Sequence, residues 1–481
     1  MTRAHAEPAD ASPHVAVIGG GVSGLVAAER LAAGGARVTL LEAGARLGGM
    51  VHTEYADPLV LERGADSVVA AKPATRALCE RLGIADRLLG PAVRGALVSR
   101  GARLRRLPAG LSGLMPTRLG PLATSRVLSP RGLARVALEP WQPPADGSGD
   151  ESLEAFVTRR LGREAYERLV EPLLTGIYAG DGARLSVGAT FPQLRAIERE
   201  HGSLVRGLRA RSRGAALPAS PFLSFPRGMQ ELVDALERAL RASGRVEVRF
   251  GAAVRLVRGP GPAGGSPVVV LAGGEWLAAD AVVVAAPVPR AGTLLAASAP
   301  DVAAELGAVA HGSTATITLA YARAAVPHAL DATGYVVPRV EGRDVLACTF
   351  VSSKWAGRAP ADVALFRVFV GGVHRAELVE RDDAALVALA RAELRATLGV
   401  AAAPRVTRVA RWVHAMPQYE LGHPERIARV QRLLAARPWL ALAGNGYAGV
   451  GVPDCIRAGE AGAVRALAAA RAPAPALAAS A

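Results

Sequence analysis

The chain has 481 residues, 51% of them hydrophobic, which is enough for two or three domains with sizeable cores. Its formal net charge is +15 at pH 7, and the basic residues are almost all arginine, with Lys72 and Lys354 as the only lysines. The sequence has neither zinc-finger spacing nor an RNA-binding signature, so we expect no nucleic-acid partner. The positive excess can favour an anionic membrane surface or acidic ligands, although an arginine-rich solvated surface explains most of it.

The three cysteines, Cys79, Cys348 and Cys455, lie far apart and include no Cys-x-x-Cys pair. This pattern argues against a disulfide framework and against a thiolate metal site, so we expect no metal ion. The first residues lack the apolar core of a signal peptide, and no apolar run reaches the roughly 20 residues that span a bilayer. We therefore expect a cytoplasmic protein whose membrane contact is peripheral.

The segment 14–41 predicts a strand, a glycine turn, a helix and a second strand, which together form a βαβ unit. Gly19, Gly21 and Gly24 follow the first strand in a G-x-G-x-x-G pattern, and Glu42 ends the second strand. Such glycines allow a tight turn and close approach to a pyrophosphate at the helix N-terminus, while the carboxylate binds ribose hydroxyls. The segment predicts a dinucleotide site; the alternative is an ordinary tight turn with a surface glutamate.

Later segments alternate between helical and strand patterns. Residues 104–210 predict short helices with apolar faces and basic edges, including one amphipathic helix over 152–174 that Ser152 caps. We expect further helices at 229–244 and 382–399, and strands at 245–258, 267–286, 313–370 and 405–419. A second glycine-rich loop at 444–451 opens a last helix near Pro453.

The two glycine-rich loops carry a family resemblance. "LLEAGARLGGMVHT" (40–53) resembles the signature of FAD enzymes in the amine oxidase and desaturase superfamily. Five later segments resemble oxygen-dependent protoporphyrinogen oxidases of haem biosynthesis, in the right order along the chain: "VEPLLTGIYAGDGARLSV", "FPRGMQELVDAL", "VSSKWAGRAP", "WVHAMPQYELGHPERI" and "GNGYAGVGVPDCIRAGEAG". In that family the FAD domain is assembled from distant segments, which would bring the second loop to the flavin end.

The resemblance implies an α/β and α+β fold with three parts. These are an FAD-binding Rossmann-like (GR2-type) domain assembled from discontinuous segments, a mixed-sheet substrate domain and a helical membrane-binding insertion. The expected segments are 14–78, 211–291 and 408–470 for the FAD-binding domain, 79–91 and 292–407 for the substrate domain, 92–210 for the insertion and 471–481 for a disordered tail.

For FAD, the resemblance implies contacts from three groups of residues. The ADP half would meet Gly19, Gly20, Gly21, Val22, Ser23, Gly24, Glu42, Ala43, Arg46 and the backbone of Val254. The flavin would meet Gly49, Met50, Gly64, Ala65, Asp66, Ser67 and Trp412, then Asn445, Val450, Gly451 and Val452 of the last loop. Ala65 and Asp66 are mild departures from the family pattern, and a core tryptophan would look the same as Trp412.

For the substrate, the resemblance implies oxidation of protoporphyrinogen IX to protoporphyrin IX by molecular oxygen, which yields hydrogen peroxide. Arg94 would bind a propionate bidentately, and the Gly176 carbonyl would face the macrocycle. Phe350 and Leu365 would pack against the ring, although core packing is the simpler explanation for each of them alone. For Arg94 the alternative is an ordinary surface arginine.

Several alternatives stay open from sequence. The substrate could be coproporphyrinogen III, the enzyme an FAD amine oxidase or carotenoid desaturase, or the protein a flavin-binding assembly factor without activity. We assign no catalytic role to His311, His414 or His423. The insertion is expected to lie on the inner (cytoplasmic) membrane, and a homodimer or contact with ferrochelatase is also open.

Overall fold

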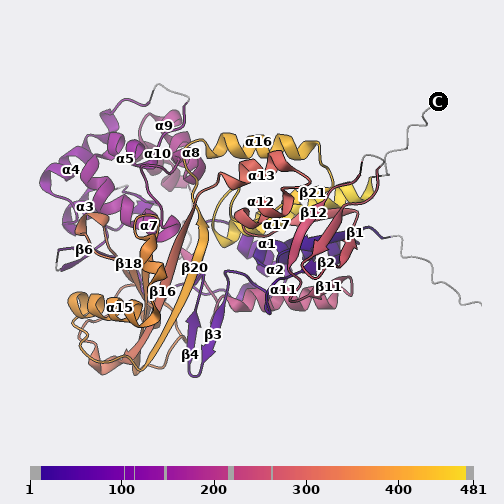
Figure 1. Cartoon of the computed structure of the whole chain (residues 1–481). Coiled ribbons are helices and arrows are strands. Elements are labelled where there is room, and N and C mark those ends of the chain that lie inside the picture. The colour runs from indigo at the N-terminus through magenta and orange to yellow at the C-terminus, as the bar shows by residue number, and fades with distance from the viewer. Residues whose placement is uncertain are drawn as a thin grey trace, which may run out of the picture.

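The computed structural model describes residues 12–101, 103–112, 114–116, 118–145, 149–214, 221–261 and 264–472. Figure 1 shows a parallel sheet with its helices on one side of the molecule, and a larger sheet with a group of helices on the other. Most of the expected tail, from 473 onward, lies outside the described residues. No helix within the described ranges is long and apolar enough to cross a membrane.

The predicted βαβ unit is confirmed, and it lies at the centre of a five-stranded parallel sheet. Both faces of this sheet are covered, which explains why its central strands are continuous apolar runs. Segments from three distant parts of the chain supply the strands, as the family resemblance implied. Their order is β11 (Val246–Arg249), β2 (Arg37–Leu41), β1 (His14–Ile18), β15 (Ala281–Val284) and β21 (Leu440–Leu442).

Helices α1 (Val22–Ala33) and α17 (Val452–Arg471) follow β1 and β21, and they cross closely near their N-termini. A Cβ at Gly459 would lie 2.4 Å from the carbonyl oxygen of Ser23, so only glycine permits this approach. The Ser23 hydroxyl donates to the Cys455 carbonyl at 2.9 Å. Because β1 and β21 are both parallel to β15, their following loops meet at one edge of the sheet.

The remaining elements of this half cover the sheet. Helix α11 (Gln230–Ala242) packs beside α1 on one face. The other face lies against a three-stranded sheet and three helices: β12 (Val254–Arg258), β13 (Val268–Leu271), β14 (Trp276–Ala278), α12 (Val288–Leu295), α13 (Pro300–Gly307) and α16 (His423–Ala435).

The second large sheet is mixed, as expected for the substrate domain, and helix α15 (Asp383–Leu398) packs against it. Its strand order is β20 (Val406–Pro417), β16 (His311–Ala322), β19 (Val363–Gly371), β18 (Val345–Phe350), β17 (Gly334–Val336), β6 (Leu97–Arg100) and β7 (Arg103–Arg106). Strands β6 and β7 lie within the expected insertion at 92–210, yet they form one end of this sheet, where Leu97 and Val98 are buried. Strand β20 continues ten residues beyond 407.

The helical group lies between β7 and β10 (Phe222–Leu223) and contains mainly short helices: α3 (Leu119–Ser125), α4 (Pro130–Ala137), α5 (Leu153–Leu161), α7 (Glu171–Tyr178), α9 (Pro192–His201) and α10 (Leu204–Gly214). Ser152 caps α5 as predicted, accepting a hydrogen bond from the Ala155 amide at 3.2 Å. The prediction of one helix over 152–174 is wrong. Gly162 adopts φ +91°, which ends α5, and α7 begins only after a turn of π-helix.

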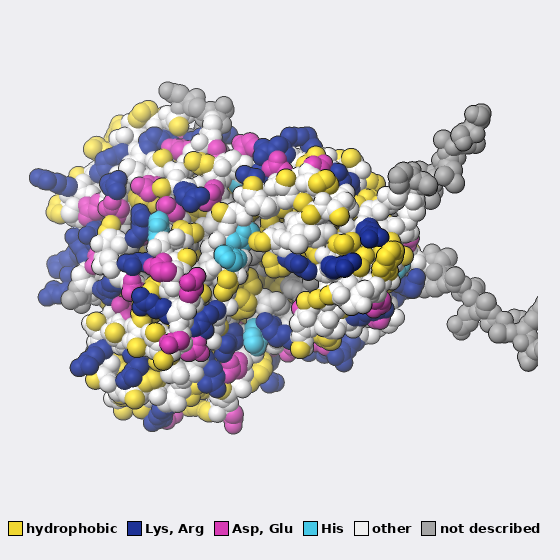
Figure 2. All heavy atoms as spheres, viewed as in Figure 1, with side chains coloured by type: hydrophobic (Ala, Val, Ile, Leu, Met, Phe, Trp, Pro, Cys, Tyr) yellow, Lys and Arg dark blue, Asp and Glu magenta, His cyan; other side chains and the backbone are white. Residues whose placement is uncertain are grey.

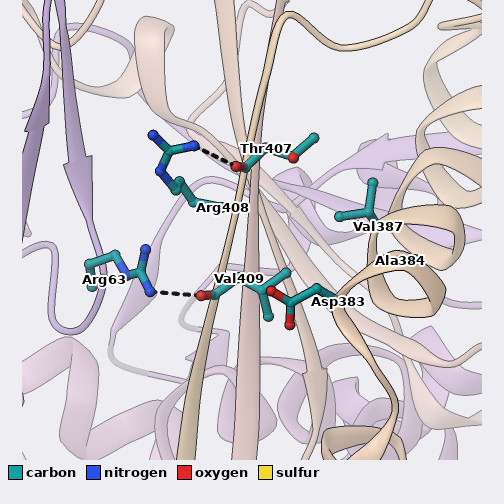
Figure 3. Close-up of a pocket in the computed structure, with 7 residues that line it drawn as sticks. All are labelled: Arg63, Asp383, Ala384, Val387, Thr407, Arg408 and Val409. Atoms are coloured by element: carbon teal, nitrogen blue, oxygen red, sulfur yellow. Dashed lines mark hydrogen bonds between the residues drawn. The ribbon is translucent and has the colours of Figure 1, made fainter.

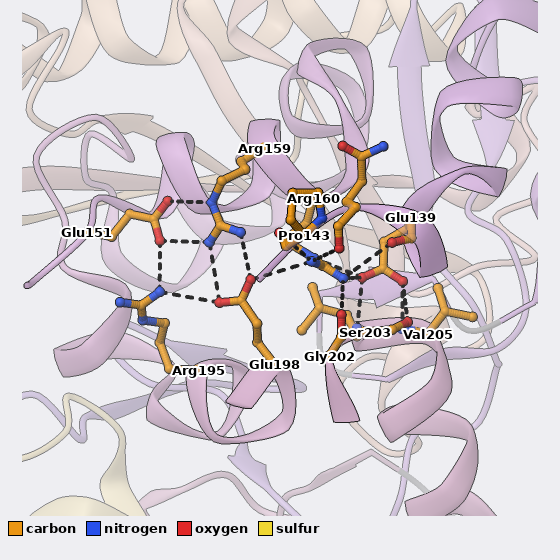
Figure 4. Close-up of polar contacts among 12 residues, drawn as sticks. Glu139, Pro143, Glu151, Arg159, Arg160, Arg195, Glu198, Gly202, Ser203 and Val205 are labelled. Atoms are coloured by element: carbon orange, nitrogen blue, oxygen red, sulfur yellow. Dashed lines mark hydrogen bonds and ion pairs between the residues drawn. The ribbon is translucent and has the colours of Figure 1, made fainter. Parts of the chain in front are cut away.

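A buried network of ion pairs holds this helical group together (Figure 4). Its members are three arginines and three glutamates: Glu139, Glu151, Arg159, Arg160, Arg195 and Glu198. The Arg160–Glu139 pair is fully buried, and Ser203 also donates to Glu139 at 2.6 Å. Part of the arginine excess in this region therefore serves internal packing.

Candidate functional site

The first glycine loop leaves open space at the N-terminus of α1. A Cβ at Gly24 would lie 1.9 Å from the Gly19 carbonyl oxygen, so this glycine allows the helix to pack on the turn. At Gly21, by contrast, a Cβ would have no protein atom within 4 Å, and no side chain caps the helix. Uncapped amides beside open space are what a bound pyrophosphate requires. The loop therefore fits the expected dinucleotide.

Glu42 ties the ends of β1 and β2 together at this loop. Its carboxylate accepts hydrogen bonds from the amides of Gly20 and Gly44, both at 2.7 Å. Each oxygen retains a further lone pair, so it can still accept a ribose hydroxyl. The Glu42 carbonyl accepts from Ala252 at 2.9 Å, which brings the start of β12, and hence Val254, to the same end.

A second glycine turn packs directly on the first. Gly48 donates to the Gly20 carbonyl at 2.8 Å, and a Cβ at Gly49 would lie 3.1 Å from the Gly21 Cα. The Arg46 guanidinium, on the neighbouring exposed segment with Ala43, donates to the Gly49 carbonyl at 2.6 Å. Arg46 therefore shapes this turn, and its expected contact with FAD stays a prediction.

The segment after Met50 continues along the same surface. A Cβ at Gly64 would lie 1.6 Å from the Met50 carbonyl oxygen and 3.2 Å from Trp412, so the backbone of 64 is clamped between them. The Trp412 indole donates to the Arg63 carbonyl at 2.8 Å. Met50, Gly64 and Trp412, which were expected to share the flavin region, are therefore neighbours.

Asp66 carries an ion pair that the sequence did not predict. Its carboxylate accepts from Lys354 at 2.8 Å and from the Ser67 hydroxyl at 2.7 Å. Burial alone would raise the pKa of Asp66, but the Lys354 ammonium and the Arg367 guanidinium hold that pKa well below its usual range. Asp66 is therefore a stable anion that fastens the segment 64–67 to the larger sheet.

The C-terminal glycine loop meets the first from the other side. Asp454, in the first turn of α17, accepts from the Gly451 amide at 3.2 Å and from Lys72 at 2.5 Å. Gly449 has φ +123°, and a Cβ there would lie 2.4 Å from the Asp454 carboxyl carbon. Asn445, Val450, Gly451 and Val452 are all partly exposed around this helix N-terminus.

The predicted substrate residues divide into two groups. Gly176 and Arg94 are exposed, and a Cβ at Gly176 would meet no atom within 4 Å, so both face open space. The loop that carries Arg94 lies next to Lys354, the ion-pair partner of Asp66, because the Ala92 amide donates to the Lys354 carbonyl at 2.8 Å. Phe350 and Leu365 are fully buried within hydrophobic cores, which favours core packing for them, and their contact with substrate stays a prediction.

A pocket of about 490 Å³ lies elsewhere, between α15 and β20 (Figure 3). Its charged side chains are already paired: Arg63 and Arg408 both bind Glu54, at 2.8 and 2.6 Å, and Asp383 binds Arg411. Because these charged groups are already engaged within the protein and none of the lining residues belongs to a glycine loop, we assign the pocket no part in cofactor binding.

Sequence reasoning missed Lys72, Lys354 and Tyr419. The first two carried a usable signal, because they are the only lysines among 57 basic residues. Each pairs with an aspartate of a predicted FAD-binding stretch. Tyr419 lay inside the quoted segment "AMPQYELGH" but received no role.

The chain is similar to flavoproteins over nearly its whole length. Residues 22–467 match the family described as flavin containing amine oxidoreductase. The coproporphyrinogen III oxidases of Propionibacterium freudenreichii subsp. freudenreichii and Bacillus subtilis (strain 168) are 36% and 33% identical, covering 92% and 94% of this chain and 88% and 97% of those proteins. A structure from Exiguobacterium sp. 255-15, provisionally named a protoporphyrinogen oxidase, matches with 32% identity and TM-score 0.83, covering 95% of this chain and 99% of that one.

Proposed function

The chain belongs to the family of flavin-containing amine oxidoreductases, and from that premise we propose that it is an FAD-dependent porphyrinogen oxidase. The predicted FAD cofactor is confirmed by the family, and the first glycine loop has the open helix N-terminus that its pyrophosphate needs. The observation that carries the proposal is the end-to-end similarity to coproporphyrinogen III oxidases, at 33–36% identity.

The C-terminal loop argues against amine oxidation. An amine oxidase would be expected to place aromatic side chains around the flavin, and Tyr447 is the only aromatic residue between Gly444 and Gly451. Its side chain is 8% exposed and belongs to the core beneath the parallel sheet, among residues such as Val288 and Leu440. This favours a porphyrinogen over an amine as the substrate.

Between the two porphyrinogens, we propose coproporphyrinogen III as the substrate. The family resemblance alone had placed protoporphyrinogen IX first, and the name of the Exiguobacterium structure supports that alternative. The two curated relatives have names that specify coproporphyrinogen III. Coproporphyrinogen III carries four carboxylates, which suits a chain with a formal charge of +15.

The reaction removes six hydrogens from the substrate in three two-electron rounds, and molecular oxygen accepts them as hydrogen peroxide. When bound, FAD supplies the two-electron acceptor for each round. The protein itself orients the substrate: the Arg94 guanidinium pairs with a propionate, and the exposed backbone at Gly176 lies against the macrocycle. The Asp66–Lys354 ion pair and Trp412 hold the segment 64–67 in place in the predicted flavin region.

Anaerobic mixing with each porphyrinogen tests the proposal, with the visible absorbance of the oxidised flavin as the readout. We expect coproporphyrinogen III to bleach the flavin and air to restore it, with coproporphyrin fluorescence appearing in parallel. Preferential bleaching by protoporphyrinogen IX would instead support the alternative substrate. Bleaching by neither, with an amine such as putrescine active, would contradict porphyrinogen oxidation altogether.

We also propose that the helical group touches membranes, since its substrate and product are poorly soluble. Among its described residues, four large apolar side chains are exposed: Leu119, Leu138, Trp141 (72%) and Ile177. Such residues flanked by arginines suit insertion into an anionic interface. On the face seen in Figure 2, however, basic and acidic side chains are interspersed over this group, so apolar insertion is the stronger part of the proposal.

A further inference from the structure

Tyr419 makes two hydrogen bonds that close the C-terminal glycine loop. Its hydroxyl donates to the Asn445 carbonyl at 2.6 Å and accepts from the Gly449 amide at 2.8 Å. The side chain is fully buried. One phenol oxygen thus joins the two ends of the segment 445–449, which enters α17 through Gly451.

Tyr419 is itself rigidly held. Its ring stacks on His423 with centroids 4.0 Å apart and planes 11° apart, and Tyr178 packs on it at 6.2 Å. The Tyr419 carbonyl accepts from the Ser186 amide at 2.8 Å. His423 adds a third contact to the loop, with Nε2 lying 3.2 Å from the Tyr447 carbonyl.

Burial of the Tyr447 side chain in the core anchors the middle of this loop, but the glycine-rich backbone on either side of it depends on hydrogen bonds such as those with Tyr419. Four of the eight residues in 444–451 are glycines, and Gly444 and Gly449 have φ values of +145° and +123°. Glycine-rich segments lose much conformational freedom on ordering, and this cost falls on cofactor binding unless the protein orders the loop beforehand. Asp454 fixes only the Gly451 end, through its 3.2 Å bond to that amide.

We propose that Tyr419 is a positioning residue for FAD, which sets the 445–449 loop before the cofactor arrives. This assigns a role to the "PQYELGH" segment, in which Tyr419 contacts Asn445 and Gly449 while His423 contacts Tyr447. Gln418 anchors the same segment to the Gly176 helix, donating to the Tyr178 carbonyl at 2.9 Å. The inference rests on flavin binding and not on which porphyrinogen is oxidised.

The direct test is Tyr419→Phe, which keeps the buried ring and removes only the hydroxyl. FAD titration of the cofactor-free protein, followed by quenching of FAD fluorescence, should show dissociation about 10- to 100-fold weaker than wild type. Amide hydrogen exchange at 445–451 should speed up by a similar factor. An FAD affinity within twofold of wild type, with unchanged exchange, would overturn the proposal.

Tyr335→Phe is the matched control. Tyr335 is also buried, and its hydroxyl donates to Glu393 at 3.0 Å within the larger sheet. We expect this variant to lose thermal stability without any change in FAD affinity. If Tyr335→Phe weakens FAD as much as Tyr419→Phe, the effect is general destabilisation and the positioning role is refuted.

His423→Leu covers the case in which Tyr419→Phe does not fold. It removes the stacking partner and the contact to Tyr447 but leaves the Tyr419 hydroxyl in place. FAD binding should weaken about two- to tenfold, and unaltered binding would refute the proposal. Because these titrations contain no porphyrinogen, they stay informative whatever substrate the enzyme proves to use.

Discussion

Replacing Lys354 with methionine should measure how much the ion pair between Asp66 and Lys354 stabilises the protein. Methionine keeps most of the length and apolar stem of lysine and removes the ammonium. The Asp66 carboxylate then keeps hydrogen bonds from Ser67 at 2.7 Å and Trp355 at 3.3 Å, but it loses its ion-pair partner at 2.8 Å. The segment 64–67, which lies in the predicted flavin region, would lose one of its anchors.

The expected loss of unfolding free energy in Lys354→Met follows from the burial of the Lys354–Asp66 ion pair. Removing one partner of a buried ion pair costs about 3–5 kcal/mol, because the other charge is left uncompensated. The Lys354 and Asp66 side chains are 11% and 19% exposed, so we expect a loss of about 3 kcal/mol in unfolding free energy at neutral pH. An exposed pair would contribute under about 1 kcal/mol.

The pH dependence separates this mechanism from a packing defect. In the wild type, Lys354 and Arg367 outweigh burial and depress the pKa of Asp66, so its contribution is present above the unfolded pKa and lost only as acid protonates the folded carboxyl. Without Lys354, Arg367 and Ser67 still oppose burial but the strongest opposing group is lost, so the pKa of Asp66 rises from its wild-type position and protonation at lower pH relieves the weakened pairing. The deficit of Lys354→Met should therefore shrink between pH 7.5 and pH 5.

Urea unfolding of the FAD-loaded protein, followed by flavin fluorescence, measures this difference at both pH values. Lys354→Arg is the matched control, since it restores a cation and should recover most of the stability. A deficit of the same size at pH 7.5 and pH 5 would refute the electrostatic account. So would a Lys354→Arg variant as unstable as Lys354→Met.

Three further changes test other parts of the molecule. Arg94→Ala should raise KM for the porphyrinogen by a factor that corresponds to about 1–3 kcal/mol of lost binding free energy, with little change in kcat. Unchanged steady-state kinetics would show that Arg94 does not contact the substrate. Glu139→Gln removes the nearer carboxylate from the buried Arg160, which keeps only the more distant Glu198 at 3.6 Å, and should cost about 3 kcal/mol in thermal or urea unfolding. The exposed Arg163→Gln should cost under about 1 kcal/mol. Trp141→Ser should reduce co-sedimentation with anionic vesicles while FAD-dependent activity in detergent stays the same.

Much of the fold could be predicted from local pattern. The βαβ unit over 14–41 and the last helix from Val452 follow from apolar periodicity and glycine placement, which act over a few residues. The break at Gly162 was missed because the apolar spacing continues through it, and the close approach of the Arg135 side chain to Gly162 is not visible in the local pattern. Strand β6 was missed because its partner β17 lies more than 220 residues away in the sequence.

The parts of the candidate site that could be predicted from sequence are those where the backbone geometry admits only glycine. Gly24 and Gly64 leave no room for a side chain, so a sequence pattern records their role directly. Ion pairs such as Lys72–Asp454 leave no such record, because they join residues 382 positions apart and any nearby cation would satisfy the aspartate. Phe350 shows that apolar residues are also hard to assign from sequence. An apolar residue near a functional segment has the same sequence pattern whether it contacts a ligand or lies in the core.

The two glycine loops lie more than 400 residues apart in the sequence because both the helical group and the larger sheet lie between them. Strands β6 and β7 and the helical group come before β11, and strands β16 to β20 come between β15 and β21. One stretch of this second insertion contacts two of the predicted FAD-binding segments. On β20, Trp412 packs on Gly64, and seven residues later Tyr419 bonds the 445–449 loop. The chain that forms the larger sheet, which was expected to belong to the substrate domain, therefore also contacts two of the predicted FAD-binding stretches. A displacement of β20 would alter the Gly64 segment and the 445–449 loop at once. Substitutions in this strand should therefore change cofactor affinity and substrate kinetics together.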